Sequence, residues 1–320
     1  MKEIAVGFWF YRFFFFVESE DVMSDSKRQE IADILKELEE SVTKIFESEY
    51  YLETFLKTYS KFHNYSLNNV IWIMQQRPEA ERVASFATWK KVGRHVKKGA
   101  KGIKVLVPVQ KKIVAEREIQ NADGTVSLEE NEYKKTFFKV GHTFDVADTE
   151  GEDLPTLVHQ LEYDSDFISS LISQIKDNSE VPICIDEDVA PFGKANGYYS
   201  LVDKDIHVRA DISGLHMLKT IIHELSHSIQ ETEYEEVKEF DRNKKEVVAE
   251  ATAYTTMKML QSEFQIEELD SSEYSFGYIC GWSTGKELSE LKETLKLIGT
   301  ISNKIFDWIV EISRQSLVTV

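Results

Sequence analysis

The segment IIHELSHSIQ, residues 221–230, constrains the fold of this chain more than any other segment. It places His223 and His227 four residues apart, with Glu224 between them. Residues four apart lie one above the other on a helix, so both imidazoles can reach one metal ion. The neighbours that would hold this helix in a core are Ile221, Ile222, Leu225 and Ile229. The sequence therefore predicts a buried helix that carries a metal site.

A third ligand is expected from a nearby helix, because catalytic zinc is held by three protein ligands and keeps a fourth position open. The apolar segment KKEVVAEATAY offers Glu246 and Glu250, again four residues apart. We predict that Glu246 completes the site and that Glu250 accepts the remaining N–H of a ligand imidazole. The spacing alone leaves open which glutamate is the ligand, and solvated glutamates are the alternative.

This donor set predicts Zn²⁺ as the cofactor and Glu224 as the general base of a hydrolase. Zinc lowers the pKa of a bound water to about 7 and polarises a carbonyl, while Glu224 passes the proton to the leaving amine. We expect the hydrolysed bond to be a peptide bond, because the H-E-x-x-H motif is typical of metalloproteases. Tyr254 and His207 are candidates for stabilising an oxyanion, with packing or a surface position as the alternative.

The stretch from Arg82 to Lys112 contains ten Lys and Arg and no Asp or Glu, in a chain with a formal net charge of −18. Cations for phosphates, glycines for a flexible backbone and nearby aromatic rings are typical of single-strand binding. A solvated surface is the alternative, and we interpret Phe86 and Trp89 as core residues rather than stacking platforms. The candidate nucleic-acid-binding residues are Arg82, Lys90, Lys91, Arg94, Lys97, Lys98, Lys101 and Lys104.

The pattern of apolar residues predicts an α+β fold with two domains, at 24–150 and 155–320. The acidic segment DTEGEDLP between them lacks apolar periodicity. We expect helices first, then strands in GIKVLVPV, KKIVAERE and YKKTFFKV, with a turn at NADG. In the second half we expect a helix in DFISSLISQIK, short strands in VPICI and GYYSLVDKDIHVR, two helices around the metal ligands, and one or two helices at the end.

Residues 1–23 are left outside both domains. The run from Ile4 to Val17 is strongly apolar, but it is interrupted by Arg12 and is shorter than the roughly 20 residues that a spanning helix needs. We interpret Met23 as the natural start and residues 1–22 as an upstream translation artefact; an N-terminal membrane anchor is the alternative. We predict no membrane span. The two cysteines, Cys184 and Cys280, are interpreted as thiols of a reducing cytoplasm.

Two parts of the chain resemble the two domains of a known protein family, in the same order as in that family. Residues 64–109 and 137–151, which include NYSLNNVIWIMQQRP and FFKVGHTFDVADTEG, resemble the N-terminal domain of ArdC-type antirestriction proteins. The run NGYYSLVDKDIHVRADIS, followed by HELSHS and EVVAEATAY, is similar to the zincin-like peptidase half of the same proteins, which is related to ImmA/IrrE metallopeptidases. The resemblance implies a first domain that binds single-stranded DNA and a second with a zinc peptidase fold. It also implies a setting in mobile DNA, where such proteins protect incoming DNA from restriction.

Three functional hypotheses follow. The first is an antirestriction protein of a mobile element, in which a DNA-binding domain targets or regulates a zinc-dependent peptidase that cleaves an unknown protein substrate. The second is a non-catalytic DNA-binding antirestriction protein with a structural or vestigial zinc site. The third is a regulatory protease that cleaves a repressor, with the basic stretch docking a protein. Glu224 favours the first over the second, because a structural site needs no general base.

Overall fold

The computed structural model describes residues 25–120, 126–154, 165–188, 192–234, 241–266 and 274–318. The N-terminal segment of residues 1–23, the NADG turn and most of the segment that follows the predicted domain boundary lie outside these ranges. In the part that the structure describes, no helix has the length and apolar character required to cross a membrane.

Three helices open the described chain, as the apolar periodicity predicts. Ser48 caps the second of them, because its side chain accepts a hydrogen bond from the backbone N–H of Tyr51. The third helix ends before Pro78, whose ring is incompatible with a continuing helix. The helices are α1 (Asp25–Glu47), α2 (Glu49–Lys61) and α3 (Leu67–Gln76).

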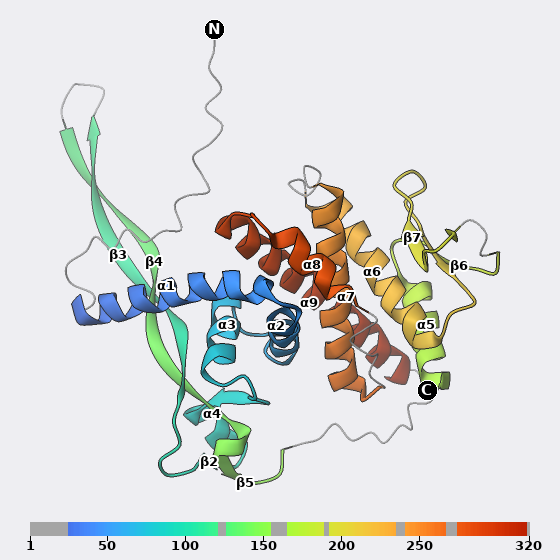
Figure 1. Ribbon diagram of the computed structural model, residues 1–320. Helices are drawn as coiled ribbons and strands as arrows, with labels where there is room; N and C mark the ends of the chain where they lie inside the picture. Colours follow the sequence, from blue (N-terminus) through green and yellow to red (C-terminus); the bar gives the residue numbers. More distant parts are fainter. Residues whose placement is uncertain are drawn as a thin grey trace.

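A long antiparallel hairpin follows and extends well past α1 in Figure 1. The three separate strands that the sequence predicts are only two, because GIKVLVPV and KKIVAERE form one continuous strand through Pro108. This strand lies at the edge of its sheet, where proline removes no hydrogen bond from a second neighbour. The hairpin is β3 (Ile103–Gln120) with β4 (Val126–Asp145), and β4 also pairs with β1 (Val83–Ser85).

Short elements surround the foot of this hairpin and were not predicted. They form a small layer that packs against the paired ends of β1 and β4. The elements are α4 (Phe86–Lys91), the paired strands β2 (Arg94–Val96) and β5 (Thr149–Gly151), and the 3-10 turn η1 (Val146–Asp148).

The second half places a small sheet against helices, with strands in the order β6-β8-β7. β6 and β8 are parallel, and β7 is antiparallel to β8. In Figure 1 this sheet lies on the side of α6 that faces away from α7. The elements are α5 (Ser165–Asn178), β6 (Ile183–Asp186), β7 (Gly197–Tyr199), β8 (Ile206–Arg209), α6 (Gly214–Glu233), α7 (Arg242–Phe264), α8 (Phe276–Ser283) and α9 (Leu288–Val318).

Helices from both predicted domains form one continuous apolar core. Leu52 and Phe55 of α2 belong to the same buried cluster as Val247 of α7 and Leu295 of α9. The mixture of helices and sheets confirms the predicted α+β class. The division into domains at 24–150 and 155–320 stays a prediction, and the shared core shows that the two parts pack directly on each other.

Candidate metal centre and nucleic-acid surface

Two packed helices, α6 and α7, carry the candidate metal ligands. Ser213 caps α6 by accepting a hydrogen bond from the backbone N–H of His216, and Asp241 caps α7 in the same way through Lys244. Ile221, Ile222 and Leu225 are buried and hold α6 in the core, as the sequence predicts, whereas Ile229 is only partly buried. Leu218, which was not predicted, is buried with them. The ligands therefore lie on rigid elements.

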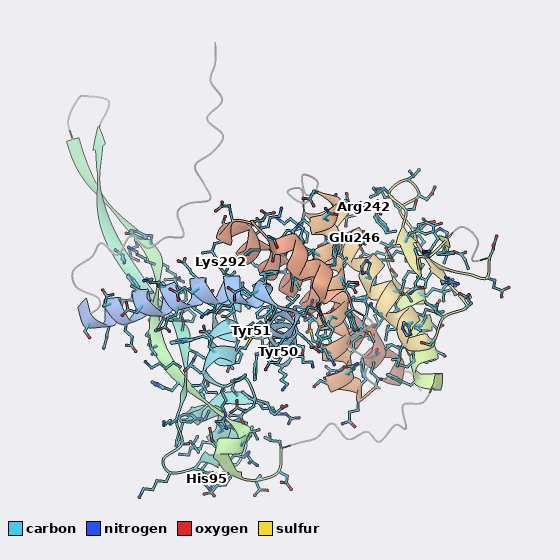
Figure 2. The ribbon with its side chains drawn as sticks, in the orientation of Figure 1. Tyr50, Tyr51, His95, Arg242, Glu246 and Lys292 are labelled. Carbon is cyan, nitrogen blue, oxygen red and sulfur yellow. The ribbon has the colours of Figure 1, made fainter. Side chains whose placement is uncertain are left out.

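Three donor atoms converge between these helices. The Nε2 atoms of His223 and His227 are 3.2 Å apart, and Glu246 Oε2 lies 3.4 Å and 3.5 Å from them respectively. Ligand atoms that are each 2.0–2.1 Å from a tetrahedral ion lie about 3.3–3.4 Å apart. The three distances therefore fit a divalent metal ion such as zinc. Figure 2 marks Glu246 where α7 runs beside α6.

Glu250 lies on the other nitrogen of His223. Its Oε2 is 3.2 Å from His223 Nδ1, while its Oε1 accepts hydrogen bonds from Ser275 N at 3.0 Å and Lys219 Nζ at 3.3 Å. Burial disfavours the charged carboxylate, but the hydrogen bond with His223 and the charge of Lys219 outweigh it and lower the pKa of Glu250 to about 2. This geometry matches the arrangement predicted for Glu246 and Glu250, whose roles in binding metal stay predictions.

The carboxylates favour a positive charge at this point. Hydrogen bonds with His223 and His227 lower the pKa of Glu246. Burial opposes the charging of His223, but its bonds with Glu246 and Glu250 raise its pKa to about 10. An electrostatic environment that holds a proton so strongly also suits a bound cation.

Glu224 lies beside the donors without being one of them. It is 7% exposed, and burial raises the pKa of its carboxyl. The backbone N–H of Tyr199 in β7 donates a hydrogen bond to it. β7 reaches this position because Gly197 has no Cβ, which would overlap Thr220 of α6 and the carbonyl of His207.

Neither candidate for stabilising an oxyanion is positioned as predicted. Tyr254 is fully buried against Tyr274 and Phe276, and its hydroxyl donates to Glu53 Oε1 at 3.3 Å. His207 bonds through Nδ1 to Asp186 and faces away from the core, because it alternates along β8 with buried Ile206 and Val208. Tyr254 therefore lies in the core, and His207 lies on the outer face of its sheet.

Tyr278 of α8 is a residue near the metal centre that sequence reasoning missed. It is 44% exposed, and its hydroxyl donates to Asn243 Oδ1 at 3.0 Å, one helical turn before Glu246. Partial burial and then the negative charge of Glu246 raise its pKa. The aromatic-rich segment SFGYICGW was the available signal, but nothing in it points to α7.

The eight predicted nucleic-acid-binding cations divide into two groups. Arg94 holds the β2–β5 pair through Thr149 and the carbonyl of Glu152, Lys97 donates to the carbonyl of Ala147, and Lys104 pairs with Glu30 at 2.9 Å. These three have partners within the protein, and their role in binding nucleic acid stays a prediction. The exposed remainder is Arg82, Lys90, Lys91, Lys98 and Lys101.

The hairpin adds cations that the sequence reasoning missed. Lys111 lies directly opposite Lys135, and Lys112 opposite Lys134, while Lys139 follows further along β4. Like charges in directly opposed positions destabilise a sheet. The missed lysines lie in the second strand, so only the pairing register brings them beside the first basic stretch.

Comparison with known proteins identifies part of the chain. Residues 25–146 match the family model for the N-terminal domain of anti-restriction factor ArdC. The first part of this chain is an ArdC-type N-terminal domain. A curated Bacillus anthracis protein described as uncharacterized, pXO2-81, is 24% identical over 87% of this chain. The chain spans about half, 52%, of the length of that relative.

Two crystal structures of the antirestriction ArdC protein from the R388 plasmid are also similar. The metal-free structure has 20% identity and a TM-score of 0.40, and covers 78% of this chain and 85% of that one. The Mn(II)-bound structure has 18% identity and a TM-score of 0.46, and covers 86% and 97% respectively.

Two aromatic side chains of the ArdC-type domain differ from each other in exposure. Trp89 is 4% exposed and its Nε1–H donates to the carbonyl of Phe144, so its assignment to the core is confirmed. Phe86 is 57% exposed, so the same prediction is wrong for it. Phe86 begins α4 just after the cap residue Ser85, and Lys90 lies four residues on, along the same side of the helix.

Proposed function

We propose that this chain is a zinc-dependent peptidase with an N-terminal domain that binds single-stranded DNA, and that it acts as an antirestriction protein. The observation that carries the peptidase proposal is the set of three donors, spaced as around a tetrahedral ion, beside the buried carboxyl of Glu224. A divalent metal fits these donors, and we propose zinc because two imidazoles and a glutamate, with the H-E-x-x-H glutamate beside them, are a ligand set of catalytic zinc.

His223, His227 and Glu246 would hold the ion. When bound, it would polarise the scissile carbonyl and lower the pKa of a water molecule to about 7. Glu224 would accept the proton of the attacking water and deliver it to the leaving amine, for which its burial and raised pKa are suited. The N–H of Tyr199 orients that carboxyl, and Glu250 fixes the ring of His223.

The position of β7 suggests an extended peptide as the substrate. Among the described strands, β7 pairs with β8 on one side only, and Tyr199 of β7 contacts Glu224. An open strand edge can pair with an extended peptide through backbone hydrogen bonds. A substrate bound there would run beside the metal centre.

Glu224→Gln tests the peptidase proposal. We expect unchanged zinc content, measured by mass spectrometry of the metal, and a loss of cleavage of about 10²-fold or more. Cleavage is measured by comparing new protein N-termini in a host lysate treated with wild type, Glu224→Gln, or the control Glu287→Gln, which changes an exposed residue on the approach to α9. Cleavage that persists in Glu224→Gln, or a purified protein without metal, would contradict the proposal.

DNA binding is proposed for the part of the ArdC-type domain that carries the exposed cations and Phe86. Lys111 and Lys135, held opposite each other in β3 and β4, repel, and a bound phosphate backbone would relieve that repulsion; Lys112 is paired with Glu132 instead. Phe86 supplies an exposed ring on which a base could stack. The structural partners of Arg94 and Lys104 leave Lys98 and Lys101 as better test positions.

The DNA proposal is tested with two variants. Lys98→Glu with Lys101→Glu should weaken binding of a labelled single strand and flatten its salt dependence, because each lost phosphate contact reduces the salt slope. Phe86→Ala should cost about 1–3 kcal/mol of binding free energy without changing that slope. Val92→Ala, another exposed apolar residue of this region, is the control. Unchanged affinity in both variants would move the DNA site elsewhere.

The antirestriction role is tested by the efficiency with which unmodified DNA enters a restricting host that expresses the protein. If Glu224→Gln protects as well as wild type, the DNA-binding hypothesis without catalysis is favoured. The protein substrate and the cytoplasmic location stay predictions.

A further inference from the structure

The outer face of the β6-β8-β7 sheet carries a second group of metal-ligating side chains, separate from the centre on α6 and α7. Ile183, Ile206 and Val208 point into the core. The alternating residues Cys184 and His207, which are paired in the β6–β8 register, lie on the opposite face. Asp205 precedes His207 by two residues and joins the same face.

The three side chains offer donors of three kinds at one point. One ligand atom each of Cys184, Asp205 and His207 lies within 4.8 Å of the others. His207 Nε2 and Asp205 Oδ2 are 3.3 Å apart. Two such atoms bound to one tetrahedral ion would lie about 3.3 Å apart.

The imidazole is already held in the orientation that a ligand needs. His207 Nδ1 is 2.7 Å from Asp186 Oδ2, so Nε2 is left to face Asp205. Tyr198 stacks on the ring, with centroids 4.9 Å apart and planes 14° apart. A carboxylate on the second nitrogen is the usual support of a metal-bound histidine.

One buried carboxylate oxygen of this group has no hydrogen-bond partner in the described structure. Asp205 Oδ1 is buried, and the described structure gives it no hydrogen bond. Buried carboxylate oxygens are almost always satisfied, by protein, water or an ion. A cation bound by both oxygens of this carboxylate, with Oδ2 on the side of His207, and shared with Cys184 would satisfy it.

We propose that Cys184, Asp205 and His207 form a second binding site for a divalent metal ion of the zinc type, oriented by Asp186 and open at a fourth position. A thiolate, an imidazole and a carboxylate together favour a borderline-soft ion over magnesium or calcium, which prefer oxygen ligands alone. In a Cys–His pair that acts as a nucleophile, one ring nitrogen contacts the thiol and no other acidic group. Here Asp186 occupies Nδ1 and Asp205 lies at Nε2, so both ring nitrogens of His207 have a carboxylate beside them. The proposal does not depend on peptidase activity at the first centre.

Cobalt is the probe, because a thiolate ligand gives Co²⁺ an ultraviolet charge-transfer band that nitrogen and oxygen ligands do not. The donors of the α6–α7 centre include no sulfur, so the band reports the second site alone. We expect the band in the full-length protein titrated with Co²⁺, its loss in Cys184→Ser, and its retention in Cys280→Ser and in His223→Ala/His227→Ala. Asp186→Asn should weaken Co²⁺ binding at this site by about 10–100-fold.

A measurement on the wild type alone guards against variants that fail to fold. Zn²⁺ should protect Cys184 from iodoacetamide while Cys280 alkylates at an unchanged rate, as mapped by peptide mass spectrometry. Absence of the charge-transfer band, its persistence in Cys184→Ser, or alkylation of Cys184 that zinc does not slow would overturn the proposal. If Cys184 alkylates fast and zinc does not slow the reaction, Cys184 is a reactive thiol rather than a metal ligand.

Discussion

At the scale of single residues, the two glutamates of α7 differ because of what surrounds each of them. Glu246 faces the Nε2 atoms of both histidines, whereas Glu250 is held by His223 Nδ1, Ser275 and Lys219. Both are glutamates on the same face of α7, one helical turn apart. Because their side chains are the same, only their neighbours can give them different roles.

Replacing Glu250 should change stability as well as metal binding. In metal-free protein its folded pKa of about 2 lies below the unfolded value of 4.5, so its ionisation stabilises the fold above about pH 4.5. That stability is lost as the pH falls towards 2. Glu250→Gln should therefore cost about 2–3 kcal/mol at pH 7 and very little near pH 2. Urea unfolding in the presence of a chelator, across this pH range, is the measurement; a cost that does not depend on pH would contradict the assignment.

A substitution of Tyr278 gives a second test at the scale of single residues. This test assumes the proposed peptidase activity. We propose that Tyr278, whose exposed hydroxyl lies near Glu246, donates to the oxyanion in place of Tyr254 and His207; Tyr278→Phe should then lower kcat by about 10²-fold with little change in KM, because one donor to the transition state is lost. Asn243→Ala removes only the partner of that hydroxyl and should retain activity. Equal losses in both variants would indicate that Tyr278 acts only through the packing of α8 on α7.

At the scale of elements, the β3–β4 hairpin carries its charges in a way that local sequence could not reveal. The ten cations between Arg82 and Lys112 are visible in the sequence, but Lys134 and Lys135 are separated from them by an acidic segment. Antiparallel pairing alone brings them opposite Lys112 and Lys111. Lys112 is paired with Glu132, but the opposed Lys111 and Lys135 should lower the stability of the hairpin, and a ligand with negative charge would offset that loss.

Reversing one charge in the hairpin should therefore separate stability from binding. Lys135→Glu would face Lys111 with an opposite charge and should stabilise the protein by about 0.2–1 kcal/mol, while weakening single-strand DNA binding. Thermal unfolding and DNA titration at two salt concentrations measure the two effects. Lys296→Glu, an exposed change in the interior of α9, should alter neither. A loss of stability in Lys135→Glu would show that the opposed lysines are not a source of repulsion.

At the scale of the whole molecule, the ArdC-type domain and the metal-centre helices are joined by direct packing. Tyr254 of α7 donates to Glu53 of α2, and Tyr59 of α2 packs on the backbone of α9 at Gly299. A Cβ at Gly299 would overlap the hydroxyl and ring of Tyr59. The contact between the two parts is therefore sensitive to one added methyl group.

Gly299→Ala tests this contact. Overpacking should cost about 1–3 kcal/mol, which exceeds the gain in helix propensity of about 1 kcal/mol. Because the core is shared, the ArdC-type domain and the helices of the candidate metal centre should unfold in one transition at a lower temperature. Tyr59→Leu in the same chain should recover part of the loss. Separate transitions, with only one of them shifted, would argue for independent domains.

The sequence by itself determined which residues share a face of an element. The spacing of His223, Glu224 and His227 predicted a metal-binding helix, and the spacing of Glu246 and Glu250 predicted a second helix beside it, because helical periodicity is a local property. It also indicated an ArdC-type domain. Only the tertiary structure decided which faces meet: that Glu246 faces the Nε2 atoms, that Tyr254 is buried against Glu53, and that Cys184 lies beside His207. These outcomes depend on how helices pack and on strand register, which are set by contacts between residues far apart in the chain.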